Sequence, residues 1–222
     1  MSHRRRLEPD PPVGSRMVTI VAHRAGNRPD TAQRASVRGD VIELDVHVFG
    51  GRAEVRHTKV LRPSSRLWEQ WRLLPIGTSV PALDEILEAV GREAPLMLDL
   101  KCFTPRAARR IRAIVPETQP LIVSSRSWWV LRAFRTRPDT PLLRSCGNRL
   151  QLRLALVVPG MGGRVGIGAH ESLLDDRAIK ATRDQTPLLF SWGVESARRG
   201  TALVEAGVTG LIVDDPELSW PR

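Results

Sequence analysis

Short apolar segments alternate with amphipathic segments along almost the whole chain. The apolar segments are rich in Val, Ile and Leu and have the length of strands, whereas the segments between them repeat apolar residues at helical spacing. The predicted strands are 16–24, 41–48, 95–101, 121–125, 141–145, 165–170, 188–192 and 211–215, and the predicted helices are 30–37, 83–90, 105–115, 128–136, 149–158, 173–183 and 197–206. Residues 54–57 extend the second strand beyond a Gly50-Gly51 turn, and 58–79 are expected to form a loop.

Eight apolar strands separated by helices predict a compact, closed (β/α)8 barrel, also called a TIM barrel. Residues 16–222 form its single domain, and the arginine-rich residues 1–15 are expected to be a flexible basic arm. An open, doubly wound parallel sheet is the alternative architecture. It usually has fewer strands, and the chain lacks the glycine-rich fingerprint of a dinucleotide site.

The composition is that of an ordinary globular protein with an excess of arginine, which gives a formal net charge of +10. This charge favours anionic partners: phosphates, nucleic acids or an anionic membrane surface touched peripherally. The basic residues are scattered, with no basic segment interleaved with aromatics, so we expect no nucleic-acid partner. No apolar run has the length of a transmembrane helix, no signal peptide is recognisable, and nothing predicts an oligomeric state.

Cys102 and Cys146 are the two cysteines of the chain, and no CxxC or His/Cys spacing accompanies them. A zinc site or a disulfide scaffold is therefore not expected. Reduced thiols fit a cytoplasmic location.

An acidic pair on the second strand is the strongest chemical signal. Glu43 and Asp45 are two residues apart, so on a strand both side chains point to the same face. Buried carboxylates need a compensating charge, which either the many arginines or a divalent cation would supply. Imidazoles lie at strand ends on both sides of this pair, His23 upstream and His57 downstream.

Polar residues recur where the predicted strands end. In a barrel these carboxyl ends form the catalytic mouth, and the residues concerned are His23, Arg24, Glu43, Asp45, His57, Asp99, Lys101, His170 and Trp192. We therefore expect most of them to line one site. His170 matches no motif that assigns it a role, and Asp214 and Asp215 are expected to cap a loop, so these three are left outside the predicted site.

In the order and spacing of its motifs, the chain from Met17 onward resembles the glycerophosphodiester phosphodiesterases, a family of the phospholipase C-like phosphodiesterase superfamily. The motifs are His23-Arg24, Pro29-Asp30-Thr31, Glu43-Leu44-Asp45-Val46, His57, Val80 to Leu87, Asp99-Leu100-Lys101, Ser191-Trp192-Gly193-Val194, and Gly207 to Pro216. The resemblance implies a barrel enzyme that hydrolyses a small-molecule glycerol phosphodiester to glycerol phosphate and an alcohol, in lipid metabolism.

The resemblance also implies a role for each site residue. Glu43, Asp45 and Asp99 would be metal ligands, and an all-oxygen carboxylate set suits Mg²⁺ or Ca²⁺, with Mn²⁺ as a further candidate. His23 and His57 would act as general acid and base, in an order that the sequence leaves open. Arg24 and Lys101 would hold the phosphate oxygens, and Trp192 would form a wall of the pocket.

The chain departs from the family pattern around the predicted metal ligands. Asp99 stands where the family usually has glutamate, and Thr58 follows His57 where an aspartate is usual. The first helix is short, and the insertion after the second strand is trimmed, which predicts a more open pocket. Two alternatives follow: a phospholipase D-like or lysophospholipid-cleaving enzyme, and a weakly active or inactive barrel that binds phosphorylated ligands.

Overall fold

The computed structural model describes residues 18–38, 40–57, 59–61, 66–69, 72–75, 78–137, 139–158, 164–216 and 220. The predicted arm, residues 1–15, lies outside the described residues, and so does Thr58. The described residues include every strand and helix predicted for the barrel, apart from residues 16 and 17 at the start of the first strand.

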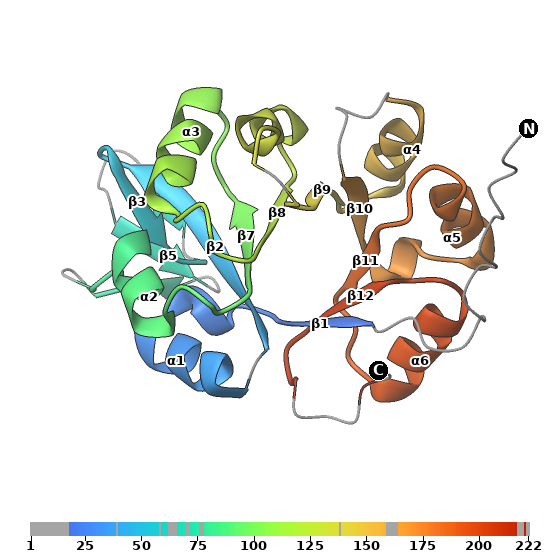
Figure 1. Ribbon diagram of the computed structural model, residues 1–222, viewed down its shortest axis with the longest axis horizontal. Helices are drawn as coiled ribbons and strands as arrows, with labels where there is room; N and C mark the ends of the chain where they lie inside the picture. The colour runs from blue at the N-terminus through green and yellow to red at the C-terminus, as the bar shows by residue number, and fades with distance from the viewer. Residues whose placement is uncertain are drawn as a thin grey trace, which may run out of the picture.

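Eight parallel strands close into a barrel (Figure 1). They are β1 (Thr19–Ala22), β2 (Val41–Phe49), β7 (Leu96–Leu100), β8 (Leu121–Ser125), β9 (Leu142–Cys146), β10 (Val165–His170), β11 (Leu189–Trp192) and β12 (Gly210–Val213). Neighbours in this order pair in parallel, and β1 closes the barrel by pairing with both β12 and β2. The closed (β/α)8 architecture is confirmed, and the open doubly wound sheet is wrong.

Helices follow the barrel strands and surround the sheet (Figure 1). The α-helices are α1 (Pro29–Arg38), α2 (Leu83–Val90), α3 (Pro105–Ile114), α4 (Arg149–Val157), α5 (Asp176–Arg183) and α6 (Ala197–Glu205), and the 3-10 helices are η1 (Ala25–Asn27), η2 (Trp128–Phe134) and η3 (Glu171–Leu173). The helix predicted over 128–136 is thus a tighter 3-10 helix. Its indole N–H groups donate to two backbone carbonyls, Trp128 to Ser145 in β9 and Trp129 to Phe103 after β7, and anchor the segment.

The segment after the second strand differs from the predicted loop. β3 (Arg52–Val55) pairs antiparallel with β2, as the Gly50-Gly51 turn predicts. β4 (Lys59–Leu61), β5 (Arg66–Glu69) and β6 (Arg72–Leu73) then form a separate antiparallel sheet within 58–79. These strands are short and carry charged residues between their apolar ones, so the period-two pattern of a strand is not visible in the sequence.

The barrel interior has an apolar floor beneath a polar mouth. Val21, Met97, Leu143, Phe190 and Ile212 pack together as one buried cluster. Side chains alternate along a strand, so the residue two positions further on points the same way and lies nearer the carboxyl end. Those residues are His23, Asp99, Ser145, Trp192 and Asp214. Larger apolar clusters between the sheet and the helices support this frame from outside.

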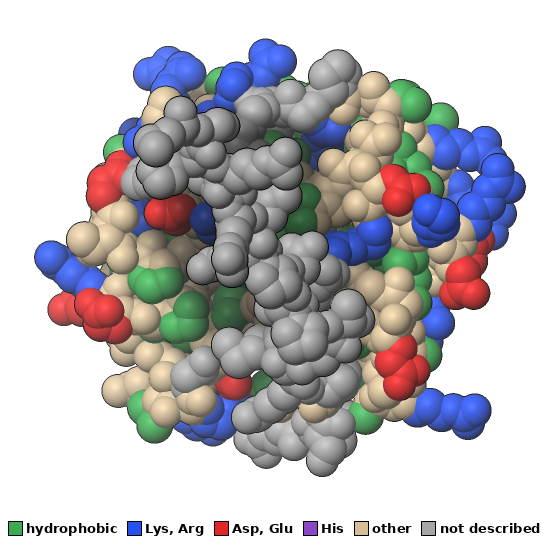
Figure 2. All heavy atoms as spheres, turned by 45° about the vertical axis from the view of Figure 1, so that its right-hand side comes forward, with side chains coloured by type: hydrophobic (Ala, Val, Ile, Leu, Met, Phe, Trp, Pro, Cys, Tyr) green, Lys and Arg blue, Asp and Glu red, His purple; other side chains and the backbone are tan. Residues whose placement is uncertain are grey.

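Basic side chains do not gather in one patch on the face of the molecule seen in Figure 2. On the face seen in Figure 2, Lys and Arg side chains lie at separate places around the rim and alternate with acidic ones. Both cysteines are buried and free of disulfides. No helix in the described part of the chain is both long enough and apolar enough to cross a membrane.

Candidate active site

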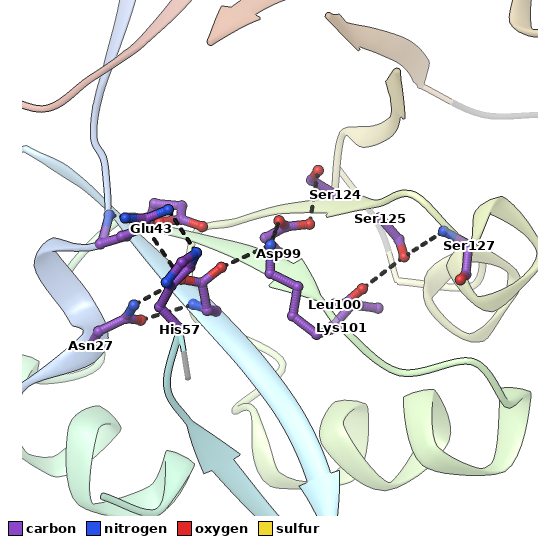
Figure 3. A network of polar contacts seen from close by, with 11 residues as sticks. Asn27, Glu43, His57, Asp99, Leu100, Lys101, Ser124, Ser125 and Ser127 are labelled. Atoms are coloured by element: carbon purple, nitrogen blue, oxygen red, sulfur yellow. Dashed lines mark hydrogen bonds and ion pairs between the residues drawn. The ribbon is translucent and has the colours of Figure 1, made fainter. Parts of the chain in front are cut away.

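A cavity of about 990 Å³ lies at the carboxyl ends of the barrel strands. All eight predicted site residues line it: His23, Arg24, Glu43, Asp45, His57, Asp99, Lys101 and Trp192. They come from the ends of several different strands, so the barrel brings together residues far apart in the sequence. Figure 3 shows the polar network between β2, β7 and β8 at the centre of this site.

Three carboxylates form a compact cluster. Asp45 and Asp99 stand opposite each other in the register of β2 and β7, and Glu43 lies two residues before Asp45 on the same face. One oxygen from each of the three carboxylates lies within 4.8 Å of the others. Asp99 thus joins the cluster although its side chain is shorter than the glutamate of the family pattern. The chemistry of this donor set fits a hard divalent cation.

Lys101 neutralises part of this acidic cluster. Its ammonium lies 2.8 Å from Oδ1 of Asp45 and also contacts the carboxylate of Asp99. Burial alone would lower the pKa of Lys101, but the carboxylates of Asp99 and Asp45 raise it well above its ordinary value. The lysine stays positively charged, and its charge is directed at the carboxylates in this structure.

The carboxyl of Glu43 is the least compensated of the three. It is 3% exposed, and burial together with the charges of Asp45 and Asp99 raises its pKa well above the ordinary value. The carboxyl of Asp45 is also buried, yet Lys101 and Asn27 outweigh that burial and hold its pKa below the ordinary value. The excess of negative charge around Glu43 is a second feature that fits a cation site.

A tight turn after β1 supports both carboxylates of β2. The side chain of Asn27 bonds to Asp45 twice, donating from Nδ2 to the carboxylate at 2.8 Å and accepting from the backbone N–H at 2.9 Å. The backbone N–H of Arg24, a residue in the left-handed region at φ 53°, donates to Glu43 at 2.6 Å. Gly26 is required here, because a Cβ would lie 2.4 Å from Leu44.

The two predicted catalytic histidines have different polar partners. Nδ1 of His23 lies 2.6 Å from Oδ1 of Asp214, and because a carboxylate only accepts, the imidazole donates. Nε2 of His57 lies 2.7 Å from Nη2 of Arg24, and because a guanidinium only donates, this imidazole nitrogen accepts. The Arg24 guanidinium also lies 3.8 Å from Asp45. His57 therefore has a lone pair on Nε2, whereas His23 has a proton on Nδ1.

Three further residues at the mouth were not predicted from the sequence. Asp214 orients His23 and is not only a loop cap. Arg126 and His47 line the cavity. Nε2 of His47 is buried without a hydrogen-bond partner among the described residues, and burial lowers the pKa of its ring to about 4. The alternation along β2 that pairs Glu43 with Asp45 also includes His47, and this was a signal in the sequence. For Arg126 the signal was its position: it comes one residue after β8, as Lys101 comes one residue after β7.

Trp192 stands in the wall predicted for it, but one of its faces is occupied. The guanidinium carbon of Arg126 lies 5.5 Å from the centre of the indole. The ring of His170 meets Trp192 edge-on, with 4.6 Å between ring centres and 82° between planes. His170 is thus a packing partner of the wall and does not line the cavity.

Comparison with known proteins identifies the fold. No family model and no curated protein matches the sequence. Among solved structures, similar ones are a phosphodiesterase from Oleispira antarctica in complex with the product sn-glycerol-3-phosphate (17% identity, 89% of this chain and 93% of that chain, TM-score 0.68) and a putative glycerophosphoryl diester phosphodiesterase from Agrobacterium tumefaciens (15% identity, 91% and 95%, TM-score 0.70). A glycerophosphodiester phosphodiesterase from Thermotoga maritima is also similar (17% identity, 91% and 96%, TM-score 0.66).

This chain has the fold of the glycerophosphodiester phosphodiesterases. The likeness runs over about nine tenths of the chain and about the same share of the solved structures. It confirms, at the level of fold, the resemblance on which the predicted site rests. Sequence identities this low show the fold and not the reaction, so the reaction has to be inferred from the chemistry of the site.

Proposed function

We propose that this chain is a metal-dependent phosphodiesterase that hydrolyses glycerophosphodiesters to glycerol phosphate and an alcohol. One observation carries the proposal: the two imidazoles, three carboxylates and two cationic side chains predicted for the site all line one cavity at the barrel mouth. This is the end of the barrel at which such enzymes hold their catalytic groups. Further support comes from the Oleispira antarctica phosphodiesterase, which shares the fold and was solved with the product sn-glycerol-3-phosphate.

Glu43, Asp45 and Asp99 would hold the cation through carboxylate oxygens. Mg²⁺ and Ca²⁺ both prefer such ligands, and Mn²⁺ is a further candidate. When bound, the cation supplies positive charge beside the phosphate oxygens, where negative charge develops in the transition state. Because the pKa of Glu43 is raised, this carboxyl keeps its proton to higher pH when no cation is present, and the proton and the cation compete for it.

Arg24 and Lys101 bind the phosphate of the substrate. In the ligand-free site the guanidinium of Arg24 donates to His57, and the ammonium of Lys101 contacts Asp45 and Asp99. An incoming phosphate accepts hydrogen bonds from the same donors and draws them away from these partners. Arg24 thereby releases Nε2 of His57 when the substrate arrives, so binding of the phosphate prepares the base.

His57 is the general base and His23 the general acid. Nε2 of His57 already accepts a hydrogen bond, so it has the lone pair that takes the proton of the attacking hydroxyl. For the products glycerol phosphate and alcohol this hydroxyl belongs to a water molecule: its oxygen forms the new bond to phosphorus, and the bond from phosphorus to the alcohol oxygen breaks. The departing oxygen takes a proton from Nε2 of the His23 imidazolium, whose ring orientation Asp214 fixes through Nδ1.

The test is phosphodiester hydrolysis by His23→Ala and His57→Ala. We expect each variant to lose about 10²- to 10⁴-fold in kcat, the usual contribution of a general acid or base. Arg109→Ala, on the exposed face of α3, is the matched control and should keep full activity. Circular dichroism checks that each variant is folded.

Full activity in both histidine variants contradicts the proposal. Turnover of lysophospholipids without turnover of glycerophosphodiesters would instead identify a phospholipase D-like activity. Binding of phosphodiesters with no metal-dependent turnover would identify a ligand-binding barrel.

A further inference from the structure

Arg126 is a cation at the mouth with no acidic partner. It is exposed, it lines the cavity, and no ion pair or hydrogen bond joins it to another residue in the part of the chain that the structure describes. It stands one residue beyond the end of β8 and two residues after Ser124, and both side chains line the cavity. The hydroxyl of Ser124 donates to Asp99 at 3.3 Å, which places Arg126 one step above the carboxylate cluster.

Hydrogen bonds hold the two residues on either side of Arg126, Ser125 and Ser127 (Figure 3). The hydroxyl of Ser125 donates to the carbonyl of Leu100 at 2.8 Å and accepts from the N–H of Ser127 at 3.1 Å. Gly147, after the next strand, leaves room for the guanidinium, because a Cβ there would lie 3.3 Å from Nη2 of Arg126. The backbone that carries this charge is thus ordered before a ligand binds, which reduces the ordering cost of binding.

The contact between Arg126 and Trp192 indicates the charge of the ligand that this wall binds. An indole face is the surface on which a quaternary ammonium group binds through cation–π contacts. Here Arg126 lies over that face, 5.5 Å from the ring centre, and the ring of His170 packs edge-on against the same indole. A substrate with a cationic alcohol such as choline is therefore repelled by the positive charge at this wall. An anion meets a planar donor suited to two parallel hydrogen bonds.

We propose that Arg126 and Trp192 form a second anion-binding subsite, which selects phosphodiesters whose alcohol part carries a further phosphate or a carboxylate. This inference rests on the proposed hydrolysis, since it names the substrate class of that same cavity. Arg24 and Lys101 stay with the phosphate that is cleaved, on the side of β1, β2 and β7. Arg126 acts from the turn after the neighbouring strand, β8, on the far end of the substrate.

The test compares two substrates that differ by one phosphate: glycerophosphoinositol and glycerophosphoinositol 4-phosphate. For the wild type we expect kcat/KM to be at least about tenfold higher for the second substrate. In Arg126→Gln the ratio of the two kcat/KM values should fall about 10- to 100-fold, as expected for loss of a charged hydrogen bond. Arg109→Gln removes one positive charge outside the cavity and should keep the wild-type ratio.

Two kinetic outcomes overturn the inference. Unchanged kcat/KM values on both substrates in Arg126→Gln show that this residue does not contact the second anion. An equal loss on both substrates, which leaves their ratio unchanged, shows that Arg126 binds the cleaved phosphate instead.

If the wild type turns over neither diester, the proposed hydrolysis fails, and calorimetry with inositol 1-phosphate and inositol 1,4-bisphosphate tests the subsite alone. Tighter binding of the bisphosphate that is lost in Arg126→Gln supports the subsite. Equal binding of both compounds contradicts it.

Discussion

Glu43 links the stability of the fold to the metal binding that we propose for the site. Its raised pKa means that the folded protein favours the protonated form of the carboxyl. Below the ordinary pKa of 4.5 the carboxyl is protonated in both the folded and the unfolded chain, and the stability that this group allows is at its highest. That stability is then lost as the pH rises from 4.5 through the pKa of the folded state. Without a cation, the ionised carboxylate therefore destabilises the fold at neutral and alkaline pH.

Replacement of Glu43 by Gln should separate these two effects. In EDTA at pH 8 we expect a higher Tm for Glu43→Gln than for the wild type, because an amide has no charge to bury; each ~1 kcal/mol corresponds to about 2–4 °C in a domain of this size. Metal-dependent stabilisation and turnover should both be lost. Thermal unfolding with and without Mg²⁺ measures the effect, and a lower Tm of the variant in EDTA would contradict this view of the site.

His47 gives the opposite pH dependence. The pKa of its ring is lowered from 6.5 to about 4, chiefly by burial; the charges of Arg56 and Lys101 add to the lowering, and the charge of Asp45 opposes it. Above pH 6.5 the ring is neutral in the folded and the unfolded chain. Between pH 6.5 and pH 4 the unfolded chain binds a proton that the folded protein does not, so stability falls as the pH falls through this window.

The variant His47→Gln should lose less stability on acidification than the wild type. Urea unfolding in EDTA at pH 7.5 and pH 5 measures the difference for both proteins. Equal losses in the two proteins would show that the ring of His47 takes up its proton as readily in the folded state as in the unfolded state.

Single residues also mark the limit of what the sequence predicts about the site. The period-two pair Glu43 and Asp45 is visible in the sequence, because alternation on a strand is a local rule. The contact of His23 with Asp214 joins residues 191 positions apart and exists only because β1 and β12 are neighbours in the closed barrel. No local pattern distinguishes such an aspartate from a loop cap.

At the scale of elements, the barrel strands depend on close contacts at glycines. Gly210 of β12 lies beside Phe190 of β11, and a Cβ on Gly210 would be 2.4 Å from the phenyl ring. Phe190 belongs to the apolar floor under the active site, where there is little room for it to move. Gly168 of β10 is the matched case, since its Cβ would meet nothing nearer than 4.0 Å.

Gly210→Ala should therefore destabilise the barrel, by about 1–3 kcal/mol as for other overpacked cores. Gly168→Ala should change the free energy of unfolding much less. Denaturant unfolding of both variants checks this, and equal destabilisation would mean that the floor adapts to the added methyl group.

Elements with a regular pattern were predictable, and those fixed by distant contacts were not. The eight barrel strands and six α-helices follow from apolar periodicity. η2, by contrast, is held by indole hydrogen bonds to Ser145 and Phe103, and the β4–β6 sheet is formed by pairing between short, charged strands. These contacts join residues that no local pattern relates.

For the whole molecule, the fold and the site chemistry point in the same direction. The barrel fold is shared with solved phosphodiesterases, and its mouth holds the carboxylates, imidazoles and cationic side chains that phosphodiester hydrolysis needs. The net charge of +10 suits an anionic substrate, although the basic residues are dispersed over the surface. The central claim is therefore the metal-dependent cleavage of a glycerophosphodiester.

The most direct measurement is release of glycerol phosphate from glycerophosphoglycerol and from glycerophosphoinositol 4-phosphate, first in EDTA and then with Mg²⁺, Ca²⁺ or Mn²⁺. We predict no turnover in EDTA, turnover restored by at least one cation, loss of that turnover in Glu43→Gln, and full turnover in Glu88→Gln, a glutamate on the exposed face of α2. Turnover that is the same with EDTA and with cations, or that persists in Glu43→Gln, would contradict the account.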